Sequence, residues 1–245
     1  MFEAKIKVDL LREVIRTVSI LVEEAKIYMG PDGMRTRAVD PAHVAMIDIE
    51  LEPSVFEEFK GDGAEVALDV DKLKDVFSLV KSDRTVTLVY DDKKNILEIR
   101  MENMKRRMSL LDPATLTDPN VPNLSPSAKV VVPVEQILQG LKASESVSDH
   151  IIFRATPEDF TLEAKGDTDN VELRLPKSQL GELDCKEEAR SLFSVSYLIG
   201  IVKTISSAEE MTIYLGTNYP AKLEFSIAKG NGKARYLLAP RIENE

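Results

Sequence analysis

The sequence predicts an α+β fold made of two copies of one domain, each with strands and two helices. Two observations predict it. A pattern of residues in the first half of the chain returns in order in the second half. Within each copy, apolar residues alternate as in half-buried strands, except in two segments where they take helical spacing. Each copy therefore reads as a strand, a helix and three strands, given twice.

The duplication is visible along the whole repeat. Residues 4–8 return as residues 128–132, an offset of 124, and the strands beginning at Ile27 and Ile151 share that offset. Residues 70–73 precede residues 195–198 by 125, and residues 110–113 match residues 237–240. These matches predict domains at 1–117 and 128–245.

The helices are predicted from apolar stripes. The first stripe runs from Leu11 to Val22, and the second from Leu73 to Val80. Their counterparts begin at Ile137 and Leu198. Asp71 and Ser196, both residue types that favour N-caps, occupy matched positions before the second helix of each copy.

The segment 118–127 is predicted to connect the domains. Four prolines fall around it, at positions 113, 119, 122 and 126. Proline resists both helix and central strand, so an extended surface connector is expected. Composition alone favours a passive linker.

Composition excludes several classes of protein. The net charge is −10 and the pI about 4.9, which disfavours a protein that grips nucleic acid through its phosphates. Cys185 is the only cysteine, so no internal disulfide can form. No apolar run approaches the length of a membrane span and no secretory signal is visible, so an intracellular protein without membrane contact is expected.

Residues for catalysis are scarce. His43 and His150 are the only histidines, too few with one cysteine for a usual zinc site. No nucleophile elbow and no Walker-type phosphate loop occur. We expect neither enzymatic activity nor a cofactor or metal.

Three segments resemble proliferating cell nuclear antigen, the sliding clamp of archaea and eukaryotes. They are residues 1–4, residues 39–44 and the ending at residues 236–243. The resemblance covers the whole chain and favours the archaeal form. It implies the DNA-clamp fold, closed as a homotrimeric ring of pseudo-sixfold symmetry with helices inside and sheets outside. Such a processivity factor encircles duplex DNA without reading its sequence. It tethers a clamp loader, DNA polymerase, flap endonuclease and DNA ligase through short hydrophobic peptides. The resemblance places the protein on DNA, in the cytoplasm of an archaeon or the nucleus of a eukaryote.

The resemblance also implies which residues serve each role. The DNA-facing residues would be Arg12, Arg16, Lys72, Lys74, Lys81, Lys142 and Lys203. Glu13, Asp75 and Ser78 stand where relatives often carry lysine, so the channel is expected to hold DNA loosely. The subunit interface would comprise Lys105, Arg106, Arg107, Met108 and Leu110 on one strand, and Val171, Glu172, Leu173 and Leu175 on another.

The implied partner pocket lies beneath the connector. It would comprise Val39, His43, Val44, Met46, Val121, Pro122, Pro220, Ala221, Leu238, Ala239 and Pro240. On this view Leu238→Asp should abolish stimulation of a partner polymerase and leave the ring intact.

Three other interpretations stay open. The chain could be one subunit of a heterotrimeric or checkpoint-type clamp. It could be an acidic α/β enzyme, which the scarcity of His and Cys disfavours. It could also be a structural duplicated domain that does not bind DNA.

Overall fold

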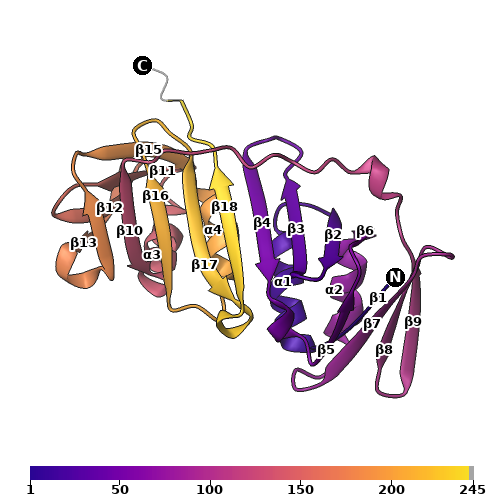
Figure 1. Ribbon diagram of the computed structural model, residues 1–245. Coiled ribbons are helices and arrows are strands. Elements are labelled where there is room, and N and C mark those ends of the chain that lie inside the picture. Colours follow the sequence, from indigo (N-terminus) through magenta and orange to yellow (C-terminus); the bar gives the residue numbers. More distant parts are fainter. Residues whose placement is uncertain (243–245) are drawn as a thin grey trace. The chain divides into compact units, whose positions relative to one another are not determined.

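The computed structural model describes residues 1–242, which form two compact units (Figure 1). Unit 1 comprises Met1–Pro41, Met46–Asn120 and Ser226–Ala234, and unit 2 comprises Ala42–Ala45, Val121–Phe225 and the residues from Arg235. None of the described helices is long and apolar enough to cross a membrane.

The first repeat contains two helices and nine strands. They are β1 (Phe2–Lys7), α1 (Val8–Ser19), β2 (Glu24–Gly30), β3 (Gly33–Val39), β4 (Ala45–Leu51), β5 (Glu58–Gly61), β6 (Ala64–Asp69), α2 (Val70–Ser78), β7 (Thr85–Asp91), β8 (Ile96–Met101) and β9 (Met104–Ser109). The strands lie in the orders β5-β1-β7-β8-β9 and β4-β3-β2-β6. All of the pairings between them are antiparallel.

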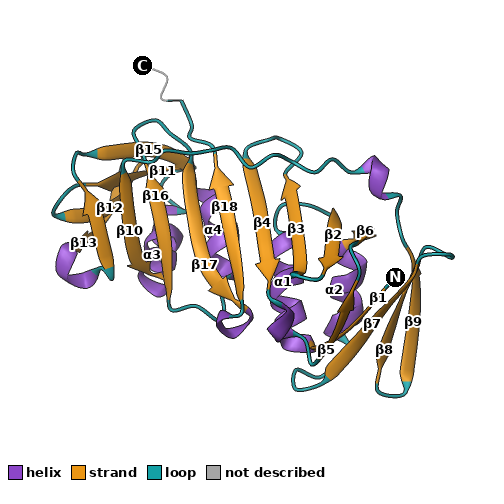
Figure 2. Ribbon diagram, in the orientation of Figure 1, coloured by secondary structure: helices purple, strands orange, loops and turns teal. Residues whose placement is uncertain are grey.

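The second repeat has the same element order. It contains β10 (Ala128–Pro133), α3 (Val134–Ser144), β11 (His150–Ala155), β12 (Asp159–Lys165), β13 (Asn170–Pro176), β14 (Glu182–Cys185), β15 (Ala189–Ser194), α4 (Val195–Thr204), β16 (Glu210–Leu215), β17 (Ala221–Ile227) and β18 (Gly232–Leu238). Its strands lie in the orders β14-β10-β16-β17-β18 and β13-β12-β11-β15. In each repeat the two helices lie side by side against strands (Figure 2). The predicted α+β fold and duplication are confirmed.

Hydrogen bonds correct the register of the duplication. The N–H of Val8 at the start of α1 donates to Arg84 O, and the N–H of Val134 at the start of α3 donates to Glu209 O. Val8 and Val134 are 126 residues apart, so the offset of 124 given to the first strands was two residues short. A shift of two residues keeps every side chain on the same face of a strand, and for that reason the alternation pattern did not reveal it.

The helix starts were also placed two residues late. Asp69, rather than Asp71, is the N-cap of α2, and its carboxylate accepts a hydrogen bond from Lys72 N–H at 2.9 Å. Ser194, rather than Ser196, is the N-cap of α4. Both segments offer two cap-forming residues, and the strands before them end at the earlier one.

Two short strands and the four 3₁₀ helices of the described residues were not predicted. β5 and β14 have four residues each, too few to show alternation. The 3₁₀ helix Pro113–Thr115 follows β9, and residues 117–126 have no regular secondary structure, as predicted for a connector.

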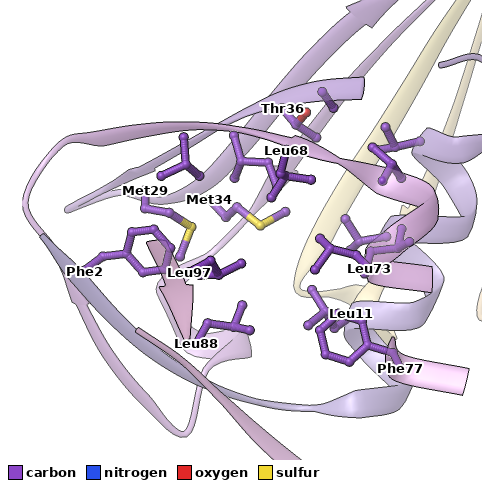
Figure 3. Close-up of a pocket in the computed structure, with 17 residues that line it drawn as sticks. Phe2, Leu11, Met29, Met34, Thr36, Leu68, Leu73, Phe77, Leu88 and Leu97 are labelled. Atoms are coloured by element: carbon purple, nitrogen blue, oxygen red, sulfur yellow. The ribbon is translucent and has the colours of Figure 1, made fainter. Parts of the chain in front are cut away.

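The core of the first repeat contains a cavity. This cavity of about 40 Å³ lies among side chains of α1, α2 and both sheets, and Phe2, Met34 and Leu68 line it (Figure 3). At the equivalent positions the second repeat has Phe160 for Met34 and Phe193 for Leu68. Both rings pack edge-on against Phe153 with centroids 5.5 Å apart.

Candidate functional site

Each helix buries its apolar stripe and exposes a face that carries charge. The exposed cations on these faces are Arg16 on α1, Lys72 and Lys74 on α2, Lys142 on α3 and Lys203 on α4. The exposed anions on the same faces are Asp9, Asp71, Asp75 and Glu135. With five cations and four anions, these faces are close to neutral in a chain whose net charge is −10.

The lysines of the two repeats differ in their partners. On α2, Lys72 Nζ lies 2.9 Å from Asp69 Oδ2 and Lys74 Nζ lies 4.0 Å from Asp71 Oδ1. Lys142 and Lys203 have no ion-pair partner within residues 1–242. An anionic ligand can therefore bind these two ammonium groups without first breaking an ion pair within the chain.

Arg12 has a structural role. Its guanidinium donates through Nε to Phe77 O at 2.9 Å, through Nη1 to Ser82 Oγ at 3.1 Å, and through Nη2 to the carbonyls of Phe77 and Val80. The carbonyls at the end of a helix have no partner within the helix. Arg12 donates hydrogen bonds to such carbonyls at the end of α2. Its positive charge is also favourable there, because the C-terminal end of the helix dipole is negative.

Two of the residues discussed for the channel do not lie on the exposed helix faces. Lys81 lies beyond the end of α2 at Ser78, in the turn that leads to β7. Glu13 is only 6% exposed, and its carboxylate accepts a hydrogen bond from the N–H of Ala228. Glu13 therefore does not present its charge on the exposed face of α1.

The strands expected to join subunits both lie at the edge of a sheet. β9 ends the order β5-β1-β7-β8-β9, and β13 ends the order β13-β12-β11-β15, so within residues 1–242 each has one edge without a neighbouring strand. An exposed edge offers a row of unpaired N–H and C=O groups to another chain.

The side chains of these edges are largely exposed. On β9, Lys105, Arg106 and Arg107 are exposed, whereas Met108 is buried in unit 1, as is Leu110 just after the strand. On β13, Glu172 is exposed, Val171 and Leu173 are half-buried, and Leu175 is buried.

Arg107 is already paired within the chain. Its Nε lies 2.8 Å from Glu98 Oε2, and Arg100 Nε lies 2.7 Å from Glu98 Oε1. Hydrogen bonds from Arg100 and Arg107 lower the pKa of Glu98. Lys105 and Arg106 have no ion-pair partner in the described part of the chain, so they are the cations that β9 can offer to another subunit.

Helix α3 supports the β13 edge at a close approach. A Cβ atom at Gly140 would lie 2.8 Å from Cδ2 of Leu173, which is nearer than a carbon contact allows. Glycine at this position therefore lets Leu173 pack directly on the helix, and it fixes the height of the edge strand above α3.

The segments expected to form the partner pocket meet at two points in unit 2. The N–H of Ala239 donates to Val44 O at 2.9 Å, which joins the turn near His43 to the end of β18. The N–H of Ser125 donates to the hydroxyl of Tyr219 at 3.2 Å, which joins the connector to the residue before Pro220. Val39 and Met46 are cross-strand neighbours in β3 and β4 of unit 1.

Exposure divides these residues into two groups. His43, Val121 and Pro122 are exposed, and Val44, Pro220, Ala239 and Pro240 are half-buried. Leu238 and Ala221 are fully buried in the core. The expectation that Leu238→Asp would leave the ring intact was therefore wrong, because an aspartate there would bury an unpaired charge.

Tyr219 is a site residue that the sequence analysis missed. Its hydroxyl accepts from the connector backbone, and its own N–H donates to Ser191 Oγ at 2.9 Å. An aromatic residue directly before Pro220 was the available signal.

The structure places no side chains for metal or thiol chemistry together. Within residues 1–242 no three His, Cys, Asp or Glu side chains are placed to hold a metal ion. The thiol of Cys185 is buried and donates to Glu187 O at 3.0 Å, and burial raises its pKa. A buried protonated thiol is a poor nucleophile.

Comparisons with known proteins agree along the whole chain. The N-terminal domain model of proliferating cell nuclear antigen matches residues 1–113, and the C-terminal domain model matches residues 120–241. A DNA polymerase sliding clamp of Methanococcoides burtonii is 39% identical and one of Methanocella arvoryzae 41% identical, each over 100% of both chains.

Solved structures show the same likeness. A. fulgidus PCNA, bound to the C-terminal region of FEN-1, superposes with a TM-score of 0.95 at 34% identity over 100% of both chains. PCNA from Thermococcus kodakaraensis superposes with a TM-score of 0.91 at 28% identity, covering 98% of this chain and 100% of that one.

Proposed function

Because the chain belongs to the proliferating cell nuclear antigen family, we propose that it is a DNA polymerase sliding clamp that closes as a homotrimer around duplex DNA. The observation that carries this proposal is the identity of about 40% along the entire length to relatives named as sliding clamps. Clamps of this family tether other enzymes and catalyse no reaction themselves. The proposal places the protein inside the cell, on DNA.

The exposed helix faces support a loose hold on DNA. A ring retains DNA by its closed topology, so it needs only weak phosphate contacts, and weak contacts permit sliding. We assign these contacts to Arg16, Lys72, Lys74, Lys142 and Lys203, whose side chains are exposed. Lys142 and Lys203 are the strongest candidates because no described carboxylate competes for them. Acidic surface elsewhere would discourage non-specific contact with DNA.

Ring closure would use the two free edges. If β9 of one subunit pairs with β13 of the next, the unpaired backbone groups of both edges are satisfied and a head-to-tail interface repeats until the ring closes. Exposed Lys105 and Arg106 on β9 and exposed Glu172 on β13 carry opposite charges, which favours this pairing over pairing of like edges.

Partner peptides would bind beside the connector. The half-buried side chains of Val44, Ala239 and Pro240 and the exposed Val121 and Pro122 offer apolar surface of the kind that marks partner sites. A. fulgidus PCNA binds the C-terminal region of FEN-1. We propose that this chain takes the same class of short peptide, from a flap endonuclease, a DNA polymerase, a ligase or the clamp loader.

Native mass and loading on DNA test the clamp function. Light scattering over a dilution series should give about 82 kDa, three times the 27.3 kDa of one chain. The trimer, loaded by the cognate loader on a nicked circle, should stay bound through gel filtration and be lost when the circle is linearised. Monomer at all concentrations would contradict self-closure and point to a heterotrimer, and equal loss from circular and linear DNA would contradict encirclement.

Titration with a peptide tests the partner site. The probe is a labelled synthetic peptide of the FEN-1 C-terminal region, and the variants are Val44→Glu and Ala239→Glu. Each should weaken binding at least about tenfold, since a charge would be buried under the peptide, while the native mass stays that of the trimer. The control is Ser178→Glu, an exposed position of unit 2. Unchanged affinity in both variants would remove these residues from the partner site.

A further inference from the structure

The turn between β17 and β18 holds three consecutive residues in the left-handed region. Ala228 has φ 51°, Lys229 φ 56° and Gly230 φ 92°. Only glycine adopts this conformation freely, and a residue with a side chain costs on the order of 1–3 kcal/mol there. Such a conformation persists only where the surroundings hold it in place.

Glu13 provides one of these restraints. Its Oε2 accepts the hydrogen bond of Ala228 N–H at 2.9 Å, and both residues are buried, Glu13 at 6% exposure and Ala228 at 0%. A carboxylate forms a stronger hydrogen bond with a backbone N–H than a neutral acceptor does. On the other side of the turn, Glu52 N–H donates to Asn231 O at 3.0 Å. Both ends of the turn are therefore fixed within unit 1.

The position of Glu13 on α1 places the turn beside the exposed face of that helix. Successive residues of an α-helix are rotated by about 100°, so Glu13 lies about 60° from Arg16 around the helix axis. Arg16 is exposed on this face, whereas Glu13 is buried and accepts a hydrogen bond from the turn. The residue that follows Ala228 is Lys229, and it is exposed.

We propose that Glu13 is a positioning residue that holds this turn so that the ammonium group of Lys229 lies beside Arg16 as a further contact for DNA phosphate. The inference rests on the proposed function, because α1 meets DNA only if the chain forms the clamp. It reverses the role that the sequence suggested for Glu13. A carboxylate facing the channel would repel DNA. The carboxylate of Glu13 instead holds the turn in place, and the turn brings the cation of Lys229 to the channel.

The counterpart of Glu13 on α3 and the counterpart of the β17–β18 turn in the first repeat both lack this device, which provides a matched control. Gln139 on α3 is the residue 126 positions after Glu13, and it is exposed. The turn between β8 and β9 is a tight one, with only Glu102 and Asn103 between the strands. Gln139→Ala should therefore change neither the turn nor the response of DNA binding to salt.

The experiment measures affinity for a short linear duplex as a function of salt concentration, with each variant confirmed as a trimer by native mass. The logarithm of affinity falls with that of salt by about 0.9 for each phosphate contact. Lys229→Ala should lower this slope by about that amount, and Glu13→Ala should lower it in the same direction. Glu13→Gln, whose amide oxygen still accepts a hydrogen bond, should keep most of the slope. The charge control is Lys177→Ala, an exposed lysine outside the four α-helices.

Hydrogen exchange separates positioning from a general loss of stability. In Glu13→Ala the amide of Ala228 should exchange about 10- to 100-fold faster, which corresponds to the loss of a hydrogen bond to a charged group. In Lys229→Ala that rate should not change. The proposal is overturned if Glu13→Ala tightens DNA binding, or if Lys229→Ala leaves the slope unchanged. Failure of the wild-type trimer to stay on circular DNA would instead overturn the proposed function.

Discussion

Arg12 shows how a residue assigned to DNA also holds the fold. The side chain reaches from α1 to the end of α2, where it joins the carbonyls of Phe77 and Val80 to the hydroxyl of Ser82. The planar guanidinium spreads its N–H donors over a rigid fork that spans these separated acceptors, whereas the compact ammonium group of lysine does not match this geometry. The charge pattern of the sequence indicates a cation here but does not show that its donors are already used.

Arg12→Ala should lower the free energy of unfolding by about 1–3 kcal/mol, because the end of α2 loses hydrogen bonds to a charged group. Arg12→Lys should recover only part of this loss. Urea unfolding measures both, and Arg16→Ala, an exposed position on the same helix, should change stability by less than about 0.5 kcal/mol. Equal stability of Arg12→Ala and the wild type would show that the solvent serves these carbonyls as well as Arg12 does.

Asp69 links the start of α2 to pH. The hydrogen bond from Lys72 N–H, followed by that from the Lys72 ammonium group, lowers the pKa of Asp69 below its ordinary 3.8. A carboxyl group with a lowered pKa in the folded state stabilises the fold above its unfolded pKa. That contribution is lost as the pH falls through the folded value.

Asp69→Ala should therefore cost about 1 kcal/mol at pH 7, the usual contribution of an N-cap. The difference from the wild type should shrink as the pH falls from about 4. Asp69→Asn keeps an acceptor that does not titrate, so its difference from the wild type should be small. Thermal unfolding at a series of pH values measures these differences, and a difference for Asp69→Ala that does not vary with pH would assign the effect to something other than the charge.

At the scale of elements, the structure explains what the apolar patterns could and could not predict. Helices and long strands followed from periodicity because each has one buried face. The strands β5 and β14 were missed because four residues are too few for a pattern. Leu238 was assigned to the partner pocket because it matches a pocket position of the family. The side chain is fully buried, and a local sequence pattern cannot predict this because burial depends on tertiary packing. The same holds for Glu13, whose hydrogen-bond partner lies 215 residues away in the sequence.

The cavity in the first repeat leads to a prediction about packing. Met34→Phe introduces the side chain that the second repeat has at Phe160, into a core where about 40 Å³ is empty. Filling a cavity with a side chain of fitting shape commonly adds about 0.5–2 kcal/mol to stability. Met34→Phe should therefore raise the midpoint of urea unfolding. The reverse change, Phe160→Met, should lower it, because the ring of Phe153 would lose one of its two edge-on neighbours.

A lower midpoint for Met34→Phe would show that the cavity has the wrong shape for the ring, since overpacking a core costs about 1–3 kcal/mol. Leu68→Phe, the counterpart of Phe193, tests the same cavity from β6. Figure 3 shows Leu68 and Met34 lining the same cavity. The two changes would fill the same space, so we do not expect their gains in stability to add.

At the scale of the whole molecule, a net charge of −10 is compatible with DNA because charge is distributed unevenly. The exposed faces of the four helices are close to neutral, and β9 carries a cluster of three cations on one free edge. Composition alone pointed away from DNA, and only the arrangement of the charges on elements reversed that conclusion. The family resemblance supplied that arrangement, and the exposure of Lys142 and Lys203 is compatible with it.

The charge on the two free edges gives the last prediction, which concerns ring closure. Arg106→Glu places an anion on β9, where the neighbour is proposed to offer Glu172 of β13. Like charges on facing strands cost up to about 1 kcal/mol for each contact, which corresponds to about a fivefold weaker association. Light scattering on dilution should therefore show Arg106→Glu dissociating at a higher concentration than the wild type. Adding Glu172→Arg to the same chain restores opposite charges across each interface, so the double variant should regain most of the lost stability. If Arg106→Glu and Glu172→Arg each weaken the trimer and their effects simply add in the double variant, the two residues do not face each other and β9 meets a different edge.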